Sequence, residues 1–97
     1  MNQLLKENYQ ADVNRGLITK ETTDLNFLNK LKSGTVEVQL EFPITTDNVI
    51  LNKERLFEEI ADCLNVCNNW LIHRGQDPEY WLTVVLKKNK KRVKKSK

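Results

Sequence analysis

The sequence predicts an all-α protein of four helices. Between Leu56 and Trp70, apolar residues recur at the i, i+3, i+4 spacing of a helix, and the same spacing returns in three other stretches. Residues typical of helix ends separate these stretches. Gly16 and Gly75 suit helix C-termini, and the dipeptide Asp77-Pro78 suits an N-terminus. The predicted helices cover residues 2–14, 23–42, 53–74 and 78–92.

The size of the chain bounds its architecture. Ninety-seven residues, 39% of them hydrophobic, make one domain with a modest core. The third predicted helix is apolar over about half of its circumference, which is more than one neighbouring helix needs. We therefore expect a four-helix bundle-like fold that is completed by oligomerisation, as a homo-dimer or a tetramer.

Charge divides the chain into two unequal parts. Residues 87–97 contain eight basic side chains and no acidic one, whereas residues 1–86 contain eight basic and thirteen acidic side chains, a net charge of −5. We expect an acidic all-α domain over residues 1–92 and a basic, disordered tail over residues 93–97. No recognition helix or RNA-binding motif accompanies the tail, so we expect no nucleic-acid partner.

The two cysteines indicate a reducing compartment. Cys63 and Cys67 are four residues apart on one predicted helix, a spacing that rarely satisfies disulfide geometry. With no signal peptide and no apolar run long enough to cross a bilayer, this predicts a cytoplasmic protein with no membrane partner. Cys63, Cys67 and His73 do not suggest zinc, because zinc ligands generally come in pairs from separate elements. We expect buried thiols and a surface imidazole.

Residues 35–42 satisfy two periods at once. From Val36 to Phe42, apolar and polar residues alternate as in a half-buried strand, and Gly34 and Pro43 are plausible strand boundaries. Helical spacing also continues through this stretch from Leu28. The pattern alone slightly favours a strand, and with a strand the chain would be a small α+β nucleic-acid-binding module.

The third predicted helix carries an E-x-x-D pair, Glu59 and Asp62. At roughly 100° per residue, Glu59 lies at the edge of the apolar arc rather than on the opposite face. Burying a carboxylate costs free energy unless the group is paired or bound to a metal. An isolated pair of this kind is most often a helix edge that pairs with a lysine. The family resemblance of the surrounding sequence favours a metal site instead.

The segment FEEIADCLNVCNNWLIHRGQDPEYWLTVVLKKNKKR resembles the C-terminal half of the MazG-like nucleotide pyrophosphohydrolases, an all-α nucleoside triphosphate pyrophosphatase family. Glu59 and Asp62 match the family's E-x-x-D motif, and Asn89 and Arg92 match its N-x-x-R motif. Upstream, RGLITKETTDLNFLNKLK resembles the approach to the family's E-E-x-x-E motif, whose last glutamate is Glu37 here. The resemblance covers residues 15–92, and it favours a helix over residues 24–42.

The resemblance implies a reaction and its residues. The family cleaves nucleoside triphosphates, in ribo or deoxy form, to a monophosphate and pyrophosphate with Mg²⁺, for which Mn²⁺ is a substitute. It implies that Glu37, Glu59 and Asp62 are catalytic and hold the metal. Glu41 lies one turn beyond Glu37 and is a further candidate ligand, although its i+4 spacing differs from the i+3 spacing of the motif. The residues expected to bind the substrate are Asn65, Asn69, Trp70, Lys88, Asn89 and Arg92.

One position departs from the family pattern. Ser33 and Gly34 occupy the places of the two leading glutamates, and Gly34 supplies no ligand. We therefore expect weak activity, and we expect Gly34→Glu to raise both Mg²⁺ affinity and helix stability. The competing hypothesis is a non-catalytic nucleotide-binding or scaffold protein of the same fold.

Overall fold

The computed structural model describes residues 2–41 and 53–95, and within these ranges the chain forms four helices and no strand. They are α1 (Gln3–Asn14), α2 (Asp24–Glu41), α3 (Lys53–His73) and α4 (Pro78–Lys95). The all-α prediction is confirmed, with α4 continuing three residues beyond its predicted end. The stretch that alternates in polarity belongs to α2 as far as Glu41, so the strand interpretation is wrong there.

Local capping explains where the helices begin and end. Gly16 and Gly75 take positive φ values of 77° and 72°, the left-handed conformation that ends a helix at low cost. At the start of α2, the Thr23 hydroxyl accepts from the Asn26 amide while the Asn26 side chain accepts from the Thr23 amide. Asp77 caps α4 by accepting from the Glu79 amide.

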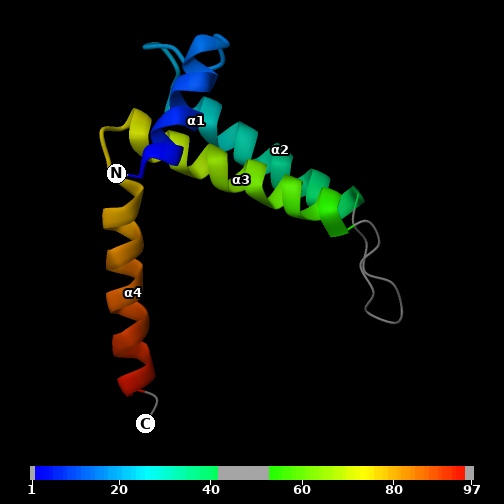
Figure 1. Cartoon of the computed structure of the whole chain (residues 1–97). Coiled ribbons are helices and arrows are strands. Elements are labelled where there is room, and N and C mark those ends of the chain that lie inside the picture. Colours follow the sequence, from blue (N-terminus) through cyan, green and yellow to red (C-terminus); the bar gives the residue numbers. More distant parts are fainter. Residues whose placement is uncertain (1, 42–52, 96–97) are drawn as a thin grey trace.

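The first three helices form the body of the molecule. α2 and α3 run antiparallel, side by side, and α1 crosses α3 near the end of that helix (Figure 1). α4 starts at this same end and points away from the other helices, so the described chain has a body and an arm (Figure 1). None of the described helices is long and apolar enough to cross a membrane.

The tightest packing lies where the α1–α2 connection meets the end of α3. Within the described residues, the buried apolar side chains are Ile18, Phe27, Leu56 and Pro78. Phe27 is 1% exposed. Its ring stacks on Trp70 at a centroid distance of 6.0 Å and an interplanar angle of 8°, and it meets His73 at 5.3 Å. The aromatic cluster fixes the start of α2 against the end of α3.

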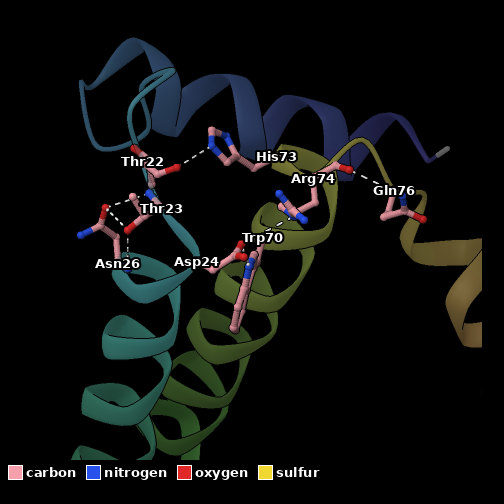
Figure 2. Close-up of polar contacts among 8 residues, drawn as sticks. All are labelled: Thr22, Thr23, Asp24, Asn26, Trp70, His73, Arg74 and Gln76. Atoms are coloured by element: carbon pink, nitrogen blue, oxygen red, sulfur yellow. Dashed lines mark hydrogen bonds and ion pairs between the residues drawn. The ribbon is translucent and has the colours of Figure 1, made fainter.

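Polar contacts reinforce the same junction (Figure 2). His73 Nε2 lies 2.8 Å from the Thr22 carbonyl oxygen, and its Nδ1 lies 3.1 Å from Tyr9 Oη. Because a carbonyl oxygen only accepts, Nε2 carries the hydrogen and donates it to Thr22. The expectation of a surface imidazole is therefore wrong: His73 is half-buried and links α3 to both α1 and the α1–α2 connection.

Asp24 completes this junction. Its carboxylate accepts from Trp70 Nε1 at 2.8 Å and lies 3.7 Å from Arg74 Nε (Figure 2). The first residue of α2 thereby holds the last turn of α3. A carboxylate at this position also suits the positive end of the α2 dipole.

Candidate functional site

A cleft of about 540 Å³ lies between α1, α2 and α3. Its volume falls within the range of small-molecule sites, roughly 300–1,000 Å³. The three helices and the start of the α1–α2 connection, which contributes Arg15 and Leu17, supply its wall. The lining residues are Asp12, Arg15, Leu17, Asn29, Lys30, Ser33, Gly34, Glu37, Glu59, Asp62, Cys63, Asn65 and Val66.

The close approach of α2 and α3 sets the register of the cleft. A Cβ atom placed on Gly34 would lie 3.0 Å from the Cys63 Sγ atom, a separation shorter than ordinary van der Waals contact. Glycine at this position therefore lets the two helices approach closely, which accounts for a residue that otherwise weakens a helix interior. Since the helices are antiparallel, this contact places Glu37 near the level of Glu59.

Three carboxylates gather at one end of the cleft. Glu37 from α2 and Glu59 and Asp62 from α3 all line it, as the resemblance implies for metal ligands. Burial raises the pKa of the Cys63 thiol, and the negative charges of Cys67, Glu59, Asp62 and Glu37 raise it further. Cys63 therefore lies beside the three carboxylates at this end of the cleft.

The donor set suits a hard cation that keeps part of its water shell. Carboxylate oxygens are the ligands that Mg²⁺ prefers, and Mg²⁺ is commonly held by one or two carboxylates together with substrate phosphates. Among the described residues, no three His, Cys, Asp or Glu side chains form a ready-made metal cluster. The three carboxylates thus form an open acidic wall rather than a closed cage.

The opposite end of the cleft carries positive charge. Arg15 lies at the end of α1, with its NH1 atom 3.7 Å from Asp12 Oδ1. Lys30 lies about two turns before Glu37 on α2, and its ammonium group donates to the Leu17 carbonyl oxygen at 3.4 Å. The cleft therefore has three carboxylates at one end and, at the other, Lys30 together with the Arg15–Asp12 ion pair.

Asp12 joins α1 to α3 from within this cleft. Its Oδ2 atom accepts from Asn69 Nδ2 at 2.8 Å and from Asn65 Nδ2 at 3.3 Å. Asn69 is 3% exposed, and its Oδ1 atom has no hydrogen-bond partner within the described part of the chain. Asp12 is not among the predicted site residues. The signal in the sequence is an acidic side chain next to Val13 and one turn from Tyr9 within the first predicted helix.

The remaining predicted substrate residues do not meet in the cleft. Asn65 lines it, whereas Asn69 is buried beneath its wall. Trp70 lines a separate pocket of about 260 Å³ between α2 and α3, where it stacks on Phe27 and bonds to Asp24. Its predicted role in substrate binding is therefore not supported by its position.

Two further groups of predicted residues lie elsewhere. Lys88, Asn89 and Arg92 belong to the α4 arm, which leads away from α1, α2 and α3 (Figure 1) and contributes no residue to the cleft. The structure does not describe the side chain of Glu41. The structure therefore places Glu37, Glu59, Asp62 and Asn65 together and keeps the α4 residues apart from them.

Comparisons of the chain with protein-family models, with curated proteins and with solved structures give no match.

Proposed function

We propose that this protein is a Mg²⁺-dependent nucleoside triphosphate pyrophosphohydrolase. One observation carries the proposal: Glu37, Glu59 and Asp62 line a single cleft, and position 34 lines it with them. These are the four positions at which the resemblance to the MazG-like family expects metal ligands. They come from two different helices and are separated by up to 28 residues in the chain.

The two ends of the cleft suit the two ends of a triphosphate reaction. Bound Mg²⁺ would neutralise phosphate charge, polarise a phosphoryl oxygen and lower the pKa of an attacking water. Glu37, Glu59 and Asp62 would hold the ion, with Mn²⁺ as a substitute. Arg15 and Lys30 would offer positive charge to phosphate oxygens that the ion does not cover. Asn29 and Asn65 would offer amide groups to the sugar or the base.

Gly34 sets the expected level of activity. With no carboxylate at this position, the ion has one anionic ligand fewer and one water more. We therefore propose a weak enzyme rather than a fast one. Substrate binding depends on the cleft as a whole and persists when catalysis is slow.

The decisive assay measures release of pyrophosphate from the full chain. All common ribo- and deoxynucleoside triphosphates are tested with Mg²⁺, with Mn²⁺ and with chelator. We expect metal-dependent formation of a monophosphate and pyrophosphate. Glu59→Gln should lower kcat/KM by about 100-fold or more, because it removes a charged group that acts on the metal and the transition state. Glu21→Gln, an exposed glutamate in the α1–α2 connection, is the matched control.

A non-catalytic nucleotide-binding protein is the second candidate. It is favoured by Gly34 and by the lack of a ready-made metal cluster in the described residues. Calorimetry separates the two candidates: nucleoside triphosphate binding that depends on Mg²⁺, with no turnover in either metal, would support the second. No binding and no turnover would reject both.

We also propose that the active form is a homo-oligomer. Twelve large apolar side chains are more than 40% exposed in the described structure, including Phe57, Leu64 and Leu82. So much exposed apolar surface on a small protein is typical of an interaction face.

A further inference from the structure

The α4 arm presents an apolar stripe that the body of its own chain does not cover. Trp81, Leu82, Val85 and Leu86 fall within an arc of about 140° on the helix. Leu82 is 65% exposed and Val85 is 49% exposed. Pro78, by contrast, is buried against the body at the start of the arm. This side of α4 is therefore not packed against the body of the same chain.

A second uncovered stripe follows α3. Phe57, Ile60 and Leu64 recur at i, i+3 and i+7, and they are 61%, 44% and 60% exposed. This stripe lies on the other side of α3 from the carboxylates of the cleft. It continues toward the small pocket lined by Leu31, Cys67 and Leu71. The arm of the same chain points away from α3 (Figure 1).

The exposed surface area of the chain is larger than that of a compact protein of the same mass. The chain exposes 7900 Å², whereas a compact protein of 11.4 kDa exposes about 5,800 Å². The radius of gyration is 16.3 Å, against about 13 Å for a compact domain of this length. The excess area of about 2,100 Å² exceeds the roughly 800 Å² that each partner buries in a standard interface.

Charge identifies the partner. Residues 87–92 of the arm contain five basic side chains and no acidic one. The far end of the α2–α3 pair, residues 37–38 and 53–62, contains five acidic and two basic side chains. An apolar stripe followed by a basic end therefore matches an apolar stripe followed by an acidic end, and both surfaces belong to this chain.

We propose that the α4 arm docks on α3 of a second copy of this chain. The Trp81–Leu86 stripe packs along the Phe57–Leu64 stripe of the other copy. The basic end of the arm then lies along the acidic end of that copy's α2–α3 pair, so α4 and the α3 it meets run antiparallel. At about 27 Å, α4 is long enough to cover both parts. Two reciprocal contacts close a two-fold dimer.

This inference concerns assembly and does not depend on the proposed reaction. A basic amphipathic helix can also bind an anionic membrane or a nucleic acid. Neither of those partners would cover the apolar stripe on α3. A second copy covers both stripes at once, which is why we prefer it.

Light scattering on the full chain is the first test. We expect twice the 11.4 kDa chain mass at micromolar concentration. We also expect a dimer that weakens between about 0.05 M and 0.5 M salt. Leu82→Glu and Leu64→Glu, one on each stripe, should each weaken the dimer at least tenfold. Thr83→Glu adds the same charge to α4 off the stripe and should leave the mass unchanged. Circular dichroism verifies that each variant keeps its helices.

Cysteine pairing tests which surfaces meet. In a Cys63→Ser, Cys67→Ser background, a chain carrying Leu82→Cys is mixed with a chain carrying Leu64→Cys. We expect a mixed disulfide between the two chains to exceed the disulfides that each chain forms alone. Preferential pairing of position 82 with itself would mean that arm meets arm and would overturn the proposal. A monomer that sediments with vesicles of anionic lipid or binds a DNA duplex through α4 would overturn it as well.

Discussion

The two halves of α3 differ in how closely they are bound to the other helices. In the second half, Asn69, Trp70 and His73 each hold a hydrogen bond to α1, α2 or the segment between them. In the first half, Phe57 and Ile60 are exposed, and neighbouring carboxylates face a cleft. One half thus fixes the fold, and the other half presents groups to a ligand and to a partner. A substitution in the second half of α3 should therefore lower stability, and a substitution in the first half should weaken binding.

The largest expected effect is on the fixed half. Phe27→Ala removes a fully buried ring that contacts both Trp70 and His73. It should lower the free energy of unfolding by about 3–5 kcal/mol, because it deletes most of the aromatic cluster. Leu25→Ala, two residues away and largely exposed, should change the free energy by no more than about 0.5 kcal/mol. Urea denaturation followed by circular dichroism measures both. Equal effects would contradict the assignment of the core to this junction.

A pair of aspartates in the same cleft separates structure from binding. Asp12→Asn weakens the acceptor for Asn65 and buried Asn69, and it should cost about 1–3 kcal/mol of stability. Asp62→Asn should leave stability unchanged or raise it slightly, because it relieves repulsion with Glu59. It should also weaken Mg²⁺ binding. Denaturation and calorimetry on both variants check this pattern, and unchanged Mg²⁺ affinity in Asp62→Asn would remove that residue from the site.

Alkylation of Cys63 provides a readout of metal binding that needs no turnover. Burial and the nearby negative charges raise the pKa of this thiol. A cation bound among Glu37, Glu59 and Asp62 would cancel part of the charge effect, lower the pKa and raise the thiolate fraction at fixed pH. In a Cys67→Ser background, saturating Mg²⁺ should therefore speed reaction with iodoacetamide about two- to fivefold near pH 8. Adding Asp62→Asn should reduce the acceleration. An unchanged rate with Mg²⁺ would argue against a cation beside Cys63.

The smallest expected effect is at the contact between α2 and α3, where Gly34 meets Cys63. Gly34→Ala gains up to about 1 kcal/mol of helix propensity but forces its new Cβ atom against Cys63 Sγ. The expectation that Gly34→Glu alone improves both the helix and the metal site is therefore incomplete. A double-mutant cycle with Cys63→Ala should show a coupling of about 0.5–1 kcal/mol. In the Cys63→Ala background, Gly34→Glu should raise Mg²⁺ affinity. No gain there would mean that position 34 does not face the ion.

The sequence predicts the helices well because their determinants are local. Gly16, Gly75 and Asp77 mark helix ends through their own backbone preferences, and they occupy the predicted positions. Asp12 and His73 could not be assigned in this way. Their roles depend on partners 57 and 51 residues away, which only the packing of three helices brings together. The pairing of Glu37 with Glu59 was predictable only in part, because the prediction needed both the helical period and the family resemblance.

The close contact between Gly34 and Cys63 also determines the order in which substitutions at these two positions can be accepted. A chain that acquires a carboxylate at position 34 while sulfur remains at position 63 passes through a crowded intermediate. A chain that first shortens residue 63 only leaves a small void and can then accept the larger side chain at position 34. Related sequences should therefore show the two positions varying as a pair, with bulk at one of them and a small residue at the other.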